Sequence, residues 1–230
     1  MFNVFIEFFD LFKWGILESL YMTLGSAFIA YIIGLPLGVL LFVTEKPRDT
    51  KPDSIFIKIF KVFHTFLGFF INVMRSIPFI ILLIFMIPVT RFIVGTSIGS
   101  TAIIVPLVAG AAPFIARLVE SSLKEVDEGM IEAARSMGAS TFQIIWKVLL
   151  PEARPSLLIG SAIAVTTIFG YAAMAGFVGG GGLGDIAIRY GFHRFQTEIM
   201  IITLLLSVVI VQVLQMIGMK LAKMGDKRAR

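Results

Sequence analysis

The chain has 230 residues, of which 57% are hydrophobic and 15% charged, with a formal net charge of +5. A soluble domain is about a quarter charged, so this composition predicts an all-α membrane protein and excludes an ordinary soluble domain. The sequence has no cysteine and two histidines far apart, which excludes disulfides and a Cys nucleophile and disfavours a metal site. In a membrane protein an excess of Lys and Arg is explained by basic loops on the cytoplasmic side of the membrane. The net positive charge therefore does not indicate a nucleic-acid partner.

The N-terminal segment MFNVFIEFFDLFKWG lacks the basic start of a cleaved signal peptide and carries two acidic residues. Its phenylalanines recur at helical spacing, at Phe2, Phe5, Phe9 and Phe12. Two interpretations stay open: an amphipathic helix lying in the membrane interface, or the beginning of the first span.

Apolar runs long enough to cross a bilayer predict five transmembrane helices within a single 1–230 domain. The predicted spans are 16–43, 70–90, 97–117, 156–178 and 199–221. Five prolines fall inside or at the ends of three of them: Pro36, Pro78, Pro88, Pro106 and Pro113. We expect kinks there, because neighbouring helices can satisfy the freed backbone groups.

The basic residues predict the orientation. The segments 45–61, 117–154 and the tail after 219 hold five Lys or Arg residues each, whereas the opposite side holds four. The positive-inside rule therefore places these three segments in the cytoplasm, with the N-terminus outside and the C-terminus inside. Arg75, within the second predicted span, has two interpretations: a functional intramembrane charge, or a side chain that snorkels near the cytoplasmic end, which we favour.

The cytoplasmic loop 118–151 has the pattern of two short helices. Asp127 can cap a helix on which Ile131, Ala134 and Met137 form one apolar side. Gly138 fits the position after the helix end, where a positive φ is favoured. Ser140 to Gln143 has the capping-box spacing for a second helix, which Pro151 is expected to end near Leu150.

The residue identities in this loop carry a resemblance. Glu132-Ala133-Ala134, Gly138 and Val148-Leu149-Leu150-Pro151 resemble the EAA motif of ABC-importer permeases, with Val148 in place of Ile. The resemblance implies a coupling helix docked on a separate ATPase subunit, with the type I ABC-importer permease fold. It implies close approach at Ala133 and Ala134, charges at the rim from Glu132 and Arg135, and a coupling role for Gly138 and Pro151.

The likeness extends over about 70–195. Arg75-Ser76-Ile77-Pro78-Phe79, the run GAAPFIARLVE at 110–120 and the run from Gly170 to Gly184 resemble the methionine-importer branch of this family. That branch implies a homodimer in the bacterial cytoplasmic membrane with two ATP-binding subunits, an extracytoplasmic substrate-binding protein and an amino-acid substrate. ATP and Mg²⁺ are then bound by the partner ATPase, and this chain is not an enzyme and holds no cofactor.

Two further features have ordinary packing as an alternative interpretation. Gly179 to Gly182 lacks the Gly-Lys-Ser/Thr of a phosphate-binding loop, so we interpret it as close helix packing or an irregular outer loop. Met174 lies among small residues, where a flexible thioether could close a narrow pathway or simply pack. With Tyr171, Phe177 and Arg75 it is our candidate for the translocation pathway.

Three candidate functions follow from these features. The first is the permease of an ATP-driven methionine importer, and the second is a permease of the same class for another small amino acid or solute. The third is a stand-alone secondary transporter or channel, which would place ionisable groups in mid-membrane. The acidic residues here lie in loops or near span ends, which disfavours the third.

Overall fold

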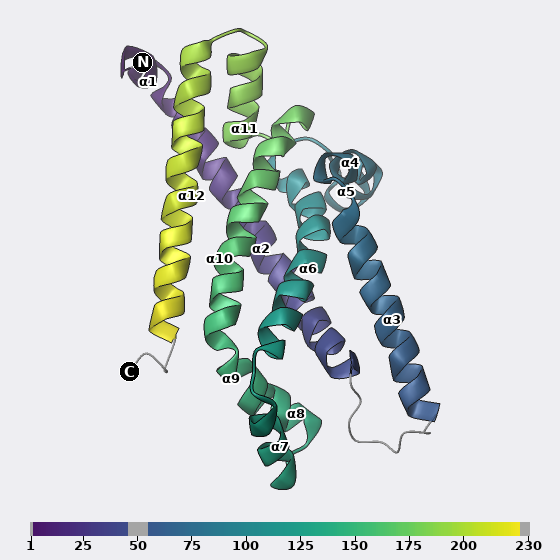
Figure 1. The fold of residues 1–230 in the computed structure, drawn as a ribbon. Coiled ribbons are helices and arrows are strands. Elements are labelled where there is room, and N and C mark those ends of the chain that lie inside the picture. The colour runs from purple at the N-terminus through teal and green to yellow at the C-terminus, as the bar shows by residue number, and fades with distance from the viewer. Residues whose placement is uncertain (1, 46–54, 226–230) are drawn as a thin grey trace. The chain divides into compact units, whose positions relative to one another are not determined.

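The computed structural model of the chain describes residues 2–45 and 55–225, and every regular element in them is helical. Within these residues, 4 helices are long and apolar enough to cross a membrane (Figure 1). They are α2 (Phe9–Glu45), α6 (Ser100–Lys124), α10 (Arg154–Met174) with its 3-10 continuation η2 (Ala175–Val178), and α12 (Thr197–Gly225). A broken pair, α3 with α4, brings the number to 5 if it counts as one span. The predicted all-α class is confirmed.

Four of the predicted spans coincide with these long helices. The range 16–43 lies within α2 and 199–221 lies within α12, while 97–117 begins just before α6. The range 156–178 is covered by α10 and η2. The exact register in a bilayer and the assignment of one domain stay predictions.

The second predicted span, 70–90, is wrong as a continuous helix. The chain instead forms α3 (Ile55–Ser76), a break at Ile77 and Pro78, α4 (Phe79–Phe85) and α5 (Ile87–Val94). Proline has no backbone N–H and disfavours the α conformation of the residue before it, so the kink expected at Pro78 becomes a complete break.

The structure shows where Arg75 lies within its helix, while its expected position near the cytoplasmic end stays a prediction. Because α3 begins at Ile55 and not near residue 70, Arg75 lies in its last turn, with an exposed side chain. At 1.5 Å per residue it is about 25 Å along the helix from Lys58. It therefore does not lie near the end of the helix that carries the lysines.

The N-terminal segment combines a short helix with the start of the first long one. Helix α1 spans Phe2–Glu7, and α2 begins at Phe9. Phe12 is buried within the described structure, so the later part of the segment belongs to a packed long helix. An interfacial position for α1 stays a prediction.

The first of two compact units comprises the described residues of Met1–Ala30, Ile77–Ala111 and Ile163–Ile217. Its buried core joins α2, α10, α12 and the short helix α11 (Gly182–Ile186). The core residues are Phe12, Phe169, Leu183, Ile186, Ile199 and Ile202. The π-helical turn η3 (Ala187–Phe192) follows α11 directly.

A glycine-rich turn connects α10 to α11 in this unit. Its positive φ angles are 73° at Gly179, 79° at Gly181 and 76° at Gly182. The Glu18 carboxylate accepts a hydrogen bond from the Gly182 N–H at 2.6 Å, and the Ser19 hydroxyl accepts one from the Leu183 N–H at 2.8 Å. The turn is thus irregular, as predicted, and two side chains of α2 satisfy the first amides of α11.

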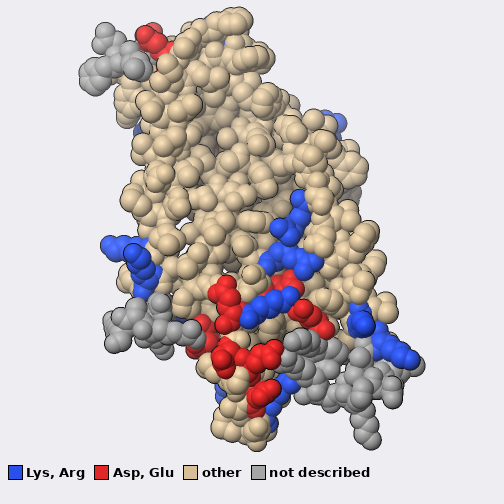
Figure 2. Space-filling model, in the orientation of Figure 1, with Lys and Arg blue, Asp and Glu red and all other residues tan. Residues whose placement is uncertain are grey.

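The second unit comprises the described residues of Tyr31–Ser76, Ala112–Ala162 and Gly218–Arg230. Its core cluster consists of Leu41, Ile71 and Ala116, from α2, α3 and α6. Charged side chains of both signs gather over the short helices between α6 and α10 (Figure 2). The loop with the family motif therefore belongs to this unit.

Candidate functional site

The first helix of the predicted coupling loop is α7 (Glu128–Ser136), and it is capped at both ends. The Asp127 carboxylate accepts a hydrogen bond from the Gly129 N–H at 2.8 Å, as predicted for the N-cap. At the other end Gly138 has a φ of 80° and donates to the Arg135 carbonyl at 2.8 Å. The Ala139 N–H donates to the Ala134 carbonyl at 3.1 Å, which completes a Schellman motif.

The second helix begins with the predicted capping box. The Ser140 N–H donates to Gln143 Oε1 at 2.8 Å, and the Gln143 N–H donates to Ser140 Oγ at 3.3 Å. Helix α8 (Thr141–Ile144) then continues through the π-helical turn η1 (Ile145–Leu149) into α9 (Leu150–Glu152). The prediction that Pro151 ends the helix near Leu150 is wrong, because the π-helical turn η1 changes the hydrogen-bond register before Pro151 and the backbone stays helical to Glu152.

The two helices bury one set of apolar side chains and expose another. Ile131 and Ala134 of α7 are buried, as are Ile144 and Leu149. Met137, predicted on the same apolar side, is 81% exposed, because it is the C-cap residue and no longer follows the helical period.

The exposed apolar face of the loop consists of Met130, Met137, Phe142 and Trp146. Phe142 is 69% and Trp146 57% exposed, and their ring centroids lie 6.0 Å apart. Exposed aromatic residues of this kind are typical of protein interfaces. This pair was not predicted from the sequence, although the i, i+4 spacing of the two aromatic residues after a helix cap could have indicated it.

The residues predicted to couple to the ATPase do not all face outward. Glu132, Ala133, Gly138 and Pro151 are exposed, and Arg135 is partly exposed. Ala134 is buried, so close approach by a partner would occur at Ala133 and not at both alanines. The expectation for Ala134 is corrected: its small side chain permits packing within the loop.

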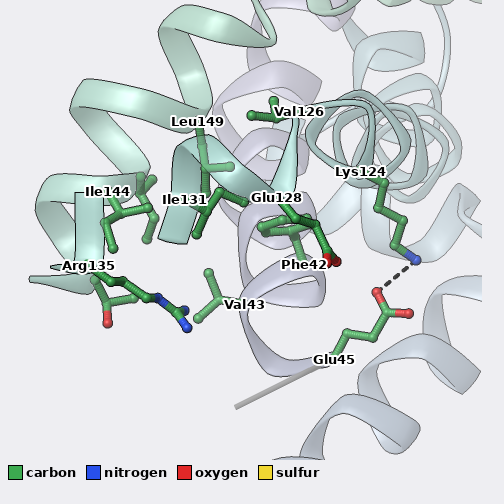
Figure 3. A pocket seen from close by; sticks show the side chains of 12 residues that line it. Phe42, Val43, Glu45, Lys124, Val126, Glu128, Ile131, Arg135, Ile144 and Leu149 are labelled. Atoms are coloured by element: carbon green, nitrogen blue, oxygen red, sulfur yellow. Dashed lines mark ion pairs between the residues drawn. The ribbon is translucent and has the colours of Figure 1, made fainter. Parts of the chain in front are cut away.

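A cavity of about 290 Å³ separates α7 and α8 from the C-terminal end of α2 (Figure 3). Its walls are mainly apolar and include Phe42 and Val43 of α2, with Ile131 and Ile144 of the loop. Charged side chains also line it: Glu45, Lys124, Glu128 and Arg135. The helices α7 and α8 therefore do not pack fully against the end of α2.

A network of charged side chains holds the C-terminal end of α6, directly before α7. The buried Glu120 carboxylate pairs with Arg117 at 2.7 Å and with Lys124 at 2.9 Å. Lys124 also pairs with Glu45 at 2.8 Å, and Arg117 donates to the Gly68 carbonyl at 3.1 Å. These contacts join α6 to the C-terminal end of α2 and to the interior of α3, so a force on the loop would reach three helices of the unit.

The predicted pathway residues lie on different units. Tyr171 stacks on Phe79 with ring centroids 4.5 Å apart and is half-buried. Met174, at the end of α10, is 44% exposed, and Phe177 is exposed in η2. Arg75 belongs to the second unit, on α3. Among residues 2–45 and 55–225, no group of three or more His, Asp and Glu residues is placed to hold a metal.

Removing the caps of the loop is expected to loosen its helices. Asp127→Ala or Ser140→Ala should each cost about 1 kcal/mol of local stability, which speeds hydrogen exchange of the following amides about fivefold. Ser136→Ala is the matched control, since its hydroxyl only bonds back to the Glu132 carbonyl at 3.0 Å. Equal exchange rates in all three variants would show that the caps do not stabilise the loop.

Comparison with known proteins identifies the family. Residues 54–230 match the family of binding-protein-dependent transport system inner membrane components. The chain belongs to this family. The matched range includes the whole coupling loop, and the resemblance seen in the EAA motif is confirmed.

Members of this family with full-length similarity include permeases named for methionine. The chain is 48% identical over 92% of its length to the probable D-methionine transport system permease protein MetI of Vibrio cholerae, covering 90% of that protein. It is 53% identical over 70% of its length to the D-methionine transport system permease protein MetI of Escherichia coli, covering 71% of it.

Solved structures confirm the permease fold. An inward-facing structure of the MetNI methionine ABC transporter is 47% identical, covers 95% of this chain and 98% of that chain, and gives a TM-score of 0.87. An amino acid ABC transporter with histidines, at 20% identity and a TM-score of 0.76, shares the fold. The chain is thus a permease component with the type I importer fold.

Proposed function

We propose that this chain is the permease subunit of an ATP-driven methionine importer. The observation that supports the proposal is its similarity, over 92% and 70% of its length, to two permeases named for D-methionine transport. Two copies of the chain would form one central pathway. The second, third and fourth predicted spans, 70–90, 97–117 and 156–178, would line it. A lightly charged pathway suits a net-neutral zwitterion, which is a weaker argument in favour of methionine.

The ATPase would be a separate polypeptide, present in two copies, that binds ATP and Mg²⁺. Its docking site on this chain would be the exposed side of α7 with Glu132, Ala133, Arg135 and Gly138, and Pro151 nearby. The exposed apolar face of the loop would supply most of the buried area, because aromatic residues and Met are enriched at interfaces. An extracytoplasmic binding protein would deliver the amino acid.

The proposed location is the bacterial cytoplasmic membrane, with the N-terminus outside and the C-terminus in the cytoplasm. The support is the clustering of Lys and Arg in the segments 117–154 and 45–61 and in the tail after 219. Ser140→Cys should react with an impermeant thiol reagent only from the cytoplasm, and His193→Cys only from outside. The opposite result for either position would reverse the orientation.

Met174 is the proposed constriction of the pathway. Its thioether is partly exposed, beside the small residues Ala173 and Ala175. Met174→Ala would widen the pathway, so we expect a higher passive leak of methionine into vesicles and lower coupling of ATP hydrolysis to uptake. Unchanged leak together with unchanged uptake would remove Met174 from the gate.

Two measurements test the proposed function. The purified chain should retain an ATPase subunit in mild detergent, which a stand-alone secondary transporter or channel would not do. Uptake of labelled methionine should then be inhibited most strongly by methionine itself within a broad panel of amino acids. An ATPase partner without competition by methionine would favour the second candidate, a permease for another small solute.

A further inference from the structure

Helix α3 presents an apolar face that is not covered by other described parts of the chain. Val62, Phe66 and Phe69 follow one another at helical spacing, and each is about two-thirds exposed. They line an open groove of about 740 Å³ together with Lys58, Lys61 and Thr65. The groove therefore has two ammonium groups at one end and aromatic rings along the rest.

The opposite side of α3 is occupied by its own unit. Ile71 is buried against Leu41, and Leu67 packs on the same cluster. The His64 ring nitrogen Nδ1 lies 3.2 Å from Thr44 Oγ1 and 3.2 Å from the Leu41 carbonyl oxygen. Helix α3 is therefore fixed on one side, while the grooved side is open.

The charges of the groove have one sign. Neither Lys58 nor Lys61 forms an ion pair with a residue of the described ranges, and none of the described residues that line the groove is acidic. Figure 2 shows basic side chains at the lower end of α3. An anion at this end would face two ammonium groups one helical turn apart.

The dimensions of the face match a lipid chain. From Lys61 to Val73, where the exposed apolar residues of this face end, the helix rises about 18 Å at 1.5 Å per residue. One leaflet of the hydrocarbon core is about 15 Å thick, half of the usual total. Lysines at the edge of an apolar helix face would thus lie at headgroup level.

We propose that this groove is a binding site for an anionic glycerophospholipid. The phosphate would lie between the ammonium groups of Lys58 and Lys61, and one acyl chain would extend along Val62, Phe66 and Phe69. A zwitterionic lipid would bring its own cation close to the two lysines and bind less well. This lipid site requires that α3 lies in the bilayer, and it is independent of which substrate the protein transports.

A fluorescent reporter in the groove tests this site. Because the chain has no cysteine, Phe66→Cys creates a single attachment point for a small thiol-reactive fluorophore. The labelled full chain is reconstituted into phosphatidylcholine vesicles that contain increasing fractions of dibrominated phosphatidylglycerol or dibrominated phosphatidylcholine. Bromine quenches only nearby fluorophores, so the two titrations give the relative binding constant of the two lipids at this groove.

Phosphatidylglycerol should bind at least about fivefold more tightly, since each basic residue near an anionic lipid contributes about that factor. Lys58→Gln/Lys61→Gln should abolish the preference. Lys220→Gln/Lys223→Gln, the same charge change at the end of α12, should keep it. Equal quenching by both lipids, or a preference that survives Lys58→Gln/Lys61→Gln, would overturn the proposal. Absence of quenching by either lipid would also overturn it, because protein would then cover the groove.

Discussion

Gly138→Val is expected to disconnect the permease from its ATPase. Gly138 has a φ of 80°, in the left-handed region that a β-branched residue strongly avoids. A Cβ at this position would meet nothing within 4 Å, so the cost is one of backbone strain and not of collision. Strain of this kind costs about 1–3 kcal/mol, enough to unwind the Schellman turn between α7 and α8.

The expected result is a loss of at least about tenfold in ATPase retained on purification, from a strain of about 1–3 kcal/mol in each permease copy. Membrane insertion and the amount of chain in the membrane should not change. Gly138→Asn is the control, because asparagine tolerates positive φ much better than valine. Normal retention and normal transport for Gly138→Val would show that coupling occurs elsewhere.

Gly184→Ala is expected to destabilise the first unit and stop transport. A Cβ at Gly184 would overlap the backbone carbonyl of Ala173, and a Cβ at Gly176 would overlap the backbone of Gly184 itself. Backbone atoms cannot turn aside as a flexible side chain can. The cost should therefore reach or exceed the usual overpacking range of about 1–3 kcal/mol.

Gly170→Ala is the matched control for this variant. Gly170 lies in α10 of the same unit, and a Cβ there would meet nothing within 4 Å. In a helix interior this change favours folding by up to about 1 kcal/mol. We expect thermal unfolding at a lower temperature, with loss of uptake, for Gly184→Ala only. The same unfolding temperature for both variants would disprove the close crossing.

Local features of the coupling loop followed directly from the sequence. The caps at Asp127 and Ser140 and the positive φ of Gly138 depend on a few adjacent residues, so spacing alone predicts them. The path through Pro151 could not be predicted, because the π-helical turn before it changes the hydrogen-bond register.

Features that depend on distant residues were predicted less well. The second span was predicted to begin near residue 70, whereas α3 begins at Ile55. Lys58 and Lys61 interrupt the apolar run in the sequence, but in the structure they lie at one end of an amphipathic helix. The close crossing at Gly176 and Gly184 joins segments on either side of a turn, and sequence gives only the small residues that permit it. The contacts of Arg117 with Gly68 and of Lys124 with Glu45 are long-range and left no pattern in the sequence.

This chain is expected to import methionine only when a separate ATPase acts on its loop. The most direct measurement is uptake of labelled methionine into vesicles that contain the chain, its ATPase and its binding protein, with and without ATP. We predict accumulation that requires ATP and is lost when the ATPase is omitted or the chain carries Gly138→Val. Accumulation by the chain without the ATPase, or ATP hydrolysis that never produces methionine uptake, would contradict it.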